Sequence, residues 1–418
     1  MELELARYPV ASLRHGEGSE YKNGHLVFDV EMLRRVLLVE PLLAEVEIHV
    51  VRPGDRTRIL HVVDIIEPRW KPAEMGNPFP GSLGPLSESG TGRTHVLEGV
   101  AVVTCASLPG SEEAIIDMCG LGSKLSRFGR MWNLVLVPRA LEGADPGEFG
   151  LAVMRSGLRA ASFLAETTKD LGPAQTESFR LELTERSAAG LPRVGYFNYV
   201  YSHGIGRQKL FYGCSTKNLL PTVIHPNEPL DGAIVNDGYT KPTKNATHDI
   251  QNHGLIRELY RRHGRELLFA GVVLANHHAT YSDKEMSAFL GARLLKHALG
   301  AEGVVVSKDG GGQADVDLML ACKACERLGM RTVLVAKEES GHEGAALVDI
   351  APQADAIVSV GNCPELVLLS QKMELVIGGR EFLGSIRGDV AGKVELPITN
   401  IIGAIDSVGA SRLAARPS

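Results

Sequence analysis

The C-terminal part of the chain alternates between apolar runs and helical patterns, and this alternation limits the possible folds more than any other feature of the sequence. Near-continuous apolar strands joined by helices are typical of a parallel sheet that is covered on both faces. We therefore predict an α/β fold with a doubly wound parallel sheet over residues 266–418. The apolar runs are LLFAGVVLAN, GVVVSK, RTVLVAK and DAIVSVG, and helices are expected over residues 283–299 and 314–328.

Polar loops follow three of the predicted strands, at residues 276–278, 308–313 and 361–365. Open parallel sheets bind ligands outside the carboxyl ends of their strands, so we expect these loops to share the ligand-binding edge. The glycine-rich loop 308–313 precedes a helix and could hold an anion there. It matches neither G-x-G-x-x-G nor a P-loop, and a tight turn is the better interpretation.

The first part of the chain has the pattern of β-structure. Short β-branched runs separated by Gly, Pro and charged residues indicate a β-rich N-terminal domain over residues 1–230. One amphipathic helix is expected after Asp145 and Pro146, which suit an N-cap and a first helical turn. Residues 75–92 are too rich in Gly, Pro and Ser to form an element, so they predict a long loop. The strand candidates are HLVFDVEML, AEVEIHVV, TRILHVVDIIE, HVLEGVAVVTC and NLVLVP.

A polar segment, residues 231–265, joins the two predicted domains, so that the class is α/β with α+β character overall. The segment holds the stretch IVNDGYTKPTKNATHDIQNHG, which is rich in His and Asn and poor in apolar residues. Burying such a stretch is costly unless its polar groups are paired with each other, with a metal or with a substrate. It is therefore the first place to look for a functional site.

Charge and hydropathy argue against two classes of partner. The formal net charge is -6, and no run of Lys and Arg is interleaved with aromatic residues, so nucleic acid is not expected. No segment reaches the roughly 18 apolar residues of a membrane span, and the N-terminal MELELARYPV lacks the pattern of a signal peptide. We expect a cytoplasmic protein with no membrane partner.

The six cysteines are expected to be reduced in a chain of this kind. Cys322 and Cys325 form a CxxC late in a predicted helix, with no second pair to complete a zinc site, so packing in the core is the better interpretation. Cys214 and Cys363 lie in polar loops, where a reactive thiol is more plausible, although a lone loop cysteine is more often inert.

Six of the 14 histidines lie between His225 and His278. Three histidines with a carboxylate could bind a divalent metal, but no H-E-x-x-H or facial-triad motif supports this. Alternatively, polar side chains of the segment line a site for a small polar substrate and serve as hydrogen-bond donors, acids and bases. The metal candidates are His248, His253, His277 and His278, the catalytic candidates are Asp237, His248 and His253, and the substrate-binding candidates are Asn236, Asn252, His225, Cys214 and Cys363.

The stretch LLPTVIHPNEPLDGAIV, residues 219–235, resembles the precursor of the substrate-specific component B of glycine, sarcosine and betaine reductases, a family related to the D-proline reductase proprotein. The resemblance implies the substrate-binding subunit of a two-protein reductase that cleaves a C–N or other C–heteroatom bond. It also implies a partner subunit that carries a reactive cysteine or selenocysteine. Further motifs in the expected order are GRTHVLEGVAVV, EEAIIDM, NLVLV, KNATHDIQNH, LYRRHG, DVDLMLACK and SVGN.

The family's cofactor is not expected in this chain. In clostridial members the proprotein is cleaved before a cysteine, which becomes a pyruvoyl group that captures an amine substrate as a Schiff base. The resemblance places that cysteine between LDGAIV and KNATHDIQNH, where this chain has NDGYTKPT, without Cys or Ser. Thr240 or Thr243 would leave a 2-oxobutyryl group instead. The chain is thus expected to be a divergent, uncut member that binds its substrate non-covalently or leaves catalysis to its partner.

Two other classes of function stay open from the residues. One is a metal-dependent hydrolase or lyase that uses the histidines, and the other is a scaffold subunit without chemistry.

Overall fold

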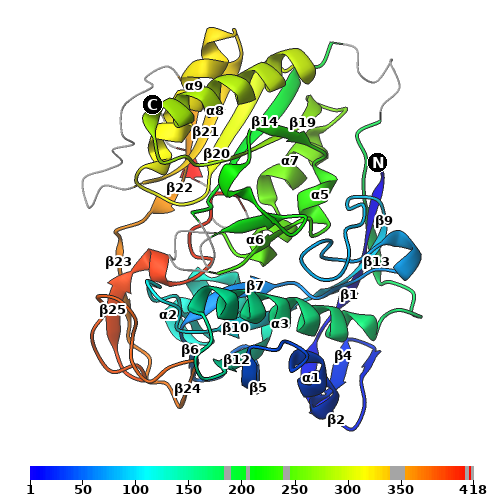
Figure 1. Cartoon of the computed structure of the whole chain (residues 1–418), viewed down its shortest axis with the longest axis vertical. Helices are drawn as coiled ribbons and strands as arrows, with labels where there is room; N and C mark the ends of the chain where they lie inside the picture. Colours follow the sequence, from blue (N-terminus) through cyan, green and yellow to red (C-terminus); the bar gives the residue numbers. More distant parts are fainter. Residues whose placement is uncertain (183–189, 204–207, 239–244, 339–353, 410–413, 416–418) are drawn as a thin grey trace.

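Two groups of sheets make up the chain, and the polar segment lies where they meet (Figure 1). The computed structural model describes residues 1–182, 190–203, 208–238, 245–338, 354–409 and 414–415. Thr240 and Thr243 lie outside the described residues. Among the described helices, none has both the length and the apolar character needed to cross a bilayer.

A seven-stranded sheet with the order β17-β19-β14-β20-β21-β22-β26 forms the α/β half. Its five middle strands pair in parallel, and the two edge strands are antiparallel. The predicted doubly wound parallel sheet is therefore confirmed. The strands are β14 (Arg193–Val200), β17 (Thr222–Ile224), β19 (Leu268–Asn276), β20 (Gly303–Lys308), β21 (Arg331–Glu338), β22 (Ala356–Asn362) and β26 (Ala414–Ala415).

Both faces of this sheet are buried because successive side chains of a strand point to opposite faces. In β14, Phe197 packs with helices α8 (Tyr281–Arg293) and α9 (Ala314–Arg327), whereas Tyr196 packs with α7 (Gly254–Arg262) on the other face. Figure 1 shows α8 and α9 side by side over the sheet. Both expected helices are present, and α8 continues into a π-helical turn, Leu294–Ala298.

The strands of the sheet cross the expected domain boundaries. β14 and β17 precede residue 231. Between β22 and β26, the chain returns to the N-terminal half, where β24 (Leu375–Ile377) pairs with β6 (Thr57–Ile59). The sequence of β14, RVGYFNYV, suits a strand, but it does not show which strands β14 pairs with. The position of β14 before residue 231 therefore placed it in the predicted N-terminal domain, whereas it pairs with β19 and β20.

The N-terminal half is β-rich, as predicted, and is built from several small sheets around helix α3 (Pro146–Glu166). Asp145 caps α3 by accepting hydrogen bonds from the backbone N–H groups of Gly147 and Glu148. One predicted strand, HLVFDVEML, is wrong in its second part. It ends at Asp29, because the Asp29 side chain caps helix α1 (Val30–Leu37).

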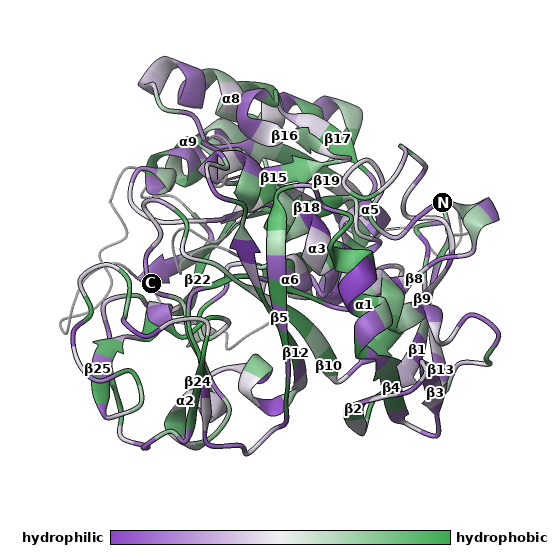
Figure 2. Cartoon of the chain, turned by 60° about the horizontal axis from the view of Figure 1, so that its bottom comes forward, coloured by the Kyte–Doolittle hydropathy of each residue, from purple (hydrophilic) through white to green (hydrophobic). Residues whose placement is uncertain are grey.

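The core of this half lies on both faces of one four-stranded sheet. Its strands, in spatial order, are β5 (Leu43–Val51), β12 (Trp132–Ala140), β10 (Val100–Cys105) and β7 (Val62–Ile66). Leu134 and Leu136 of β12 join the cluster that holds most of the buried α3 side chains, and Val135 joins the cluster on the opposite face. Strands β10 and β12 are largely coloured hydrophobic in Figure 2. Residues 76–91 contain neither helix nor strand, which confirms the predicted loop.

The remaining elements are short and mostly connect the larger ones. In the N-terminal half they are β1 (Leu3–Pro9), β2 (Ser12–Gly16), β3 (Glu20–Lys22), β4 (His25–Asp29), β8 (Arg69–Trp70), η1 (Ala73–Met75), β9 (Gly92–Glu98), β11 (Ile116–Asp117), α2 (Gly120–Leu125), η2 (Arg127–Arg130) and β13 (Gln175–Phe179). Further along the chain they are β15 (Lys209–Phe211), β16 (Cys214–Ser215), η3 (Thr216–Asn218), α5 (Asn227–Leu230), β18 (Ile234–Asn236), α6 (Thr247–Gln251), β23 (Leu366–Leu369), β25 (Val394–Pro397) and η5 (Ile398–Asn400).

Candidate functional site

Residues 231–238 and 245–253 of the polar segment are buried between the two halves of the molecule, except for the half-buried Asn252. Asn236 and His253 are 0% exposed, and Asp237, Asn245 and His248 are at most 4% exposed. Buried polar groups must be paired to offset the loss of water. The segment is therefore a built structure and not a solvated linker.

A buried ion pair, which we call the Lys209–Asp309 pair, holds the chain on both sides of positions 239–244. Lys209 Nζ lies 3.1 Å from Asp309 Oδ2, and it donates hydrogen bonds to Asn236 Oδ1 at 3.0 Å and to the carbonyl oxygen of Asn245 at 2.7 Å. The backbone N–H of Asn245 donates to Asp309 Oδ1 at 2.9 Å. One cation and one anion thus bind residues on both sides of positions 239–244.

This pair lies at the carboxyl edge of the parallel sheet. Asp309 follows directly on β20, and its backbone carbonyl oxygen is 2.9 Å from Nε2 of His277, which follows directly on β19. Two of the three predicted rim loops therefore meet here. Next to them, Asp237 accepts a hydrogen bond from the backbone N–H of Gln208 at 2.8 Å.

Helix α6 leads from this edge toward the N-terminal half. At its start, Asp64 of β7 accepts hydrogen bonds from the backbone N–H and the hydroxyl of Thr247, at 2.9 and 2.6 Å. Burial raises the pKa of Asp64 to about 7, against the lowering effect of these bonds. Asp249 is also buried, which raises its pKa although Arg127 pairs with it.

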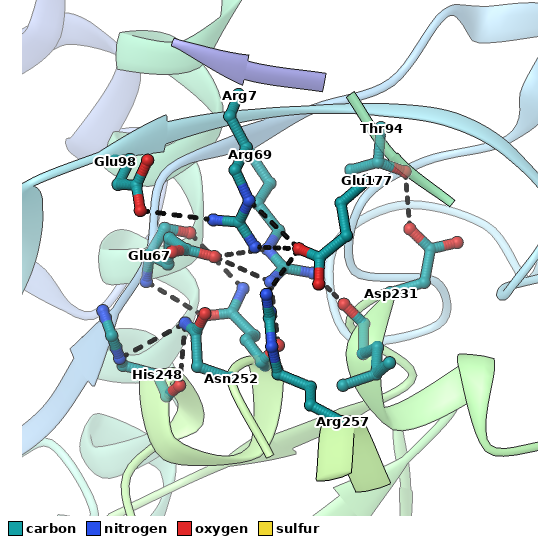
Figure 3. Close-up of polar contacts among 12 residues, drawn as sticks. Arg7, Glu67, Arg69, Thr94, Glu98, Glu177, Asp231, His248, Asn252 and Arg257 are labelled. Atoms are coloured by element: carbon teal, nitrogen blue, oxygen red, sulfur yellow. Dashed lines mark hydrogen bonds and ion pairs between the residues drawn. The ribbon is translucent and has the colours of Figure 1, made fainter. Parts of the chain in front are cut away.

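A cavity of about 500 Å³ lies on the other side of α6, and charged side chains from both halves line it (Figure 3). We call it the arginine cavity. Its lining includes Arg7, Glu67, Arg127, Glu177, His248, Asn252 and Arg257.

Of the sequence-predicted site residues, His248 and Asn252 line the arginine cavity. Burial lowers the pKa of His248 to about 3, although Glu67 opposes the shift, so the ring is neutral near pH 7. The His248 ring packs edge-on against Phe128, and its Nδ1 is 3.4 Å from Nδ2 of Asn252. A neutral imidazole can accept or donate a hydrogen bond but cannot supply a positive charge.

The other predicted residues lie elsewhere. His253 caps α7 by accepting from the backbone N–H of Ile256 and is 3.2 Å from the hydroxyl of Tyr196, and burial lowers its pKa to about 3. His225 accepts a hydrogen bond from the backbone N–H of Asn227, and burial lowers its pKa to about 4. Cys214 is exposed and Cys363 is buried. In the described structure, none of these four side chains lines the arginine cavity.

The histidines proposed as metal ligands do not converge. His277 Nδ1 is 3.1 Å from Asp317, while the rings of His248 and His253 pack against Phe128 and Tyr196. No three His, Cys, Asp or Glu residues in the described ranges are arranged to hold a metal ion. The metal-dependent alternative gains no support from this part of the chain.

Sequence reasoning missed the residues that organise the site. Two of these residues, Arg7 and Lys209, lie outside the polar segment. A third, Arg257, lies within it, on the amphipathic helix α7. No local motif distinguishes any of the three from an ordinary surface residue. Asp309 belongs to a loop that was interpreted as a tight turn, and its role depends on Lys209.

Comparisons with known proteins identify the family. A family model of glycine/sarcosine/betaine reductase component B subunits matches residues 1–416. The chain belongs to this family.

Relatives in the component B family are similar to this chain over most or all of their length. The glycine reductase complex component B subunits alpha and beta of Peptoclostridium acidaminophilum are 33% identical over 432 residues, which cover 100% of both chains. The sarcosine reductase complex component B subunit alpha of the same organism is 31% identical over 432 residues, again covering 100% of both. Its betaine reductase complex component B subunit alpha is 33% identical over 396 residues, or 92% of this chain and 89% of the relative. No solved structure gives a significant match.

In this component B chain, the stretch in which the family's cleavage cysteine was expected has a different composition. Residues 236–246 read NDGYTKPTKNA and contain neither Cys nor Ser. On both sides of positions 239–244 the chain is held by the Lys209–Asp309 pair. The side chains that hold the chain there include an ammonium, a carboxylate and an amide, those of Lys209, Asp309 and Asn236.

Proposed function

We propose that this chain is the substrate-binding subunit of a two-protein reductase. Together with its partner, it cleaves a C–N or other C–heteroatom bond of a small polar substrate. It does so without a pyruvoyl group. The relatives carry the names of glycine, sarcosine and betaine reductase complexes, which supports a subunit of a reductase complex. The cytoplasm is the compartment that fits this role.

The substrate site is proposed at the carboxyl edge of the sheet, beside the Lys209–Asp309 pair. Ligands of open parallel sheets bind at this edge. Asn236, Asp237 and Asn245 are held there by the pair and by Gln208, so their polar groups are fixed before a substrate arrives. Fixed polar groups reduce the entropy lost on binding.

The chemistry of the substrate follows from the absent thiol. A Schiff base requires an amine N–H, whereas a quaternary nitrogen has none. A partner thiolate that attacks the carbon of such a substrate forms a C–S bond, and the C–N electron pair departs with a neutral tertiary amine, so no proton transfer is needed. A quaternary or carboxylate substrate is therefore better suited to this chain than a primary amine.

The observation that carries the proposal is full-length membership in the component B family together with the lack of Cys and Ser in residues 236–246. The test is to purify the chain with a neighbouring-gene partner that carries a reactive Cys or selenocysteine and to screen small quaternary and carboxylate substrates for released amine. Turnover by this chain with all partners absent would refute the two-protein mechanism. Turnover that a carbonyl reagent abolishes would refute the absence of an electrophilic cofactor.

A further inference from the structure

Two arginines that line the arginine cavity, Arg7 and Arg257, share one carboxylate, that of Glu177. Glu177 Oε2 accepts from Nε and Nη2 of Arg7, at 3.2 and 2.9 Å, and also from Nη2 of Arg257. Glu67 accepts two hydrogen bonds from Arg69, at 3.2 and 2.7 Å. One carboxylate oxygen of Glu177 thus serves two guanidinium groups, as Figure 3 shows, while Glu67 is bound by Arg69, which is not in the cavity lining.

The lining has four arginines and four glutamates in all, but its remaining charges do not complete the pairing of Arg257. Glu258 pairs with Arg261 and Arg262. Glu98 is half-exposed and reaches Arg7 only at 3.8 Å. Arg127, on another wall, is already paired with Asp249 and Asp406. The guanidinium group of Arg257 therefore depends on the Glu177 oxygen that it shares with Arg7.

Arg257 is the group that an added anion would satisfy. Its Nη1 is buried and has no hydrogen-bond partner among the residues that the structure describes. Burial lowers the pKa of Arg257, and the positive charge of Arg7 adds to this effect against the attraction of Glu177. A buried charged group without a full set of partners is unfavourable, and an acceptor oxygen at the guanidinium would relieve it.

The neutral side chains of the cavity add a donor. His248 Nδ1 faces the amide nitrogen of Asn252 and so serves as the acceptor, which assigns the ring proton to Nε2. His248 and Asn252 both belong to the lining. The Nε2–H of His248 is therefore a donor beside the guanidinium groups, whereas the side-chain N–H groups of Asn252 are used by Nδ1 and the carbonyl oxygen of His248.

We propose that the arginine cavity is a binding site for a small monocarboxylate, separate from the Lys209–Asp309 pair. The planar fork of an arginine matches the two oxygens of a carboxylate. The four glutamates of the lining, Glu67, Glu98, Glu177 and Glu258, oppose the entry of a second negative charge, which disfavours phosphate and other dianions. The Lys209–Asp309 pair and the residues that it binds, Asn236 and Asn245, are not part of this lining.

The test measures binding to the full chain alone, by ligand-observed NMR at constant ionic strength with chloride as the background anion. The probes are acetate, its neutral counterpart acetamide, and inorganic phosphate. Acetate is expected to bind saturably, with a dissociation constant in about the millimolar range for so few atoms. Acetamide and phosphate are each expected to bind at least about tenfold more weakly.

Matched variants on helix α7 locate the site. Arg257→Gln should weaken acetate binding about tenfold or more, and Arg257→Lys should weaken it less, because the charge remains. Arg262→Gln is the control, since this side chain is on the same helix, is 41% exposed, pairs with Glu258 and Glu266 and does not line the cavity. Thermal unfolding is measured to check that each variant is folded. If Arg257→Gln does not fold, Arg257→Lys still tests the proposal.

Three outcomes would overturn the proposal: acetate that binds no better than acetamide, phosphate that binds more tightly than acetate, or acetate binding that Arg262→Gln weakens as much as Arg257→Gln. Because the readout is binding to the isolated chain, it does not depend on turnover by any complex.

Discussion

Removing the charge of Lys209 tests whether the Lys209–Asp309 pair holds the site together. Lys209 is 0% exposed and Asp309 is 2% exposed, so a Lys209→Met variant leaves a carboxylate in the interior without its counter-ion. The variant also removes the hydrogen bonds to Asn236 and Asn245. Removing one partner of a buried ion pair costs about 3–5 kcal/mol, and we expect the free energy of unfolding to fall by about this amount.

The measurement is urea-induced unfolding followed by circular dichroism and by tryptophan fluorescence. Lys217→Met is the matched control, because Lys217 is exposed and its substitution should change the free energy of unfolding by no more than about 0.5 kcal/mol. Adding Asp309→Asn to Lys209→Met removes the stranded charge and should recover part of the loss. A loss below about 1 kcal/mol in Lys209→Met, or a double variant less stable than the single one, would refute the argument.

Three further predictions follow from the site. Intact mass spectrometry should show one polypeptide of about the calculated 45.0 kDa, and two fragments with a carbonyl-reactive second piece would contradict an uncut chain. His248→Ala should lower turnover of the reconstituted complex by about 10²-fold if His248 is a positioned acid or base, with the fold retained, whereas wild-type turnover would exclude that role. The pKa of Asp64 is raised from 3.8 to about 7, so between these pH values the folded state binds one more proton than the unfolded state. The free energy of unfolding of the wild type should therefore fall from pH 4 to pH 7, by on the order of 4 kcal/mol relative to Asp64→Asn. Parallel urea unfolding at both pH values checks this, and a pH-independent difference would contradict it.

The sequence alone determined the elements whose stability is local. Each parallel strand of the α/β half carries its own apolar run, because a strand buried on both faces needs apolar side chains at every position. Helix α3 was predictable because Asp145 caps it and apolar residues recur along it at helical spacing. Family membership was predictable for a similar reason, since colinear motifs such as KNATHDIQNH survive in the order of the chain.

The tertiary structure alone decided which distant segments meet. Pairing of β24 with β6 and the place of β14 in the large sheet depend on contacts across the chain, which local periodicity does not encode. The Lys209–Asp309 pair joins residues 100 positions apart, and Arg7 reaches Glu177 across 170 positions. The pKa values of Asp64 and His248 are also tertiary properties, because burial sets them and the residue types by themselves do not. The sequence thus located the polar segment. The buried ion pair and the arginine cavity that flank it were decided by the fold, because both depend on side chains that meet only after the two halves have packed together.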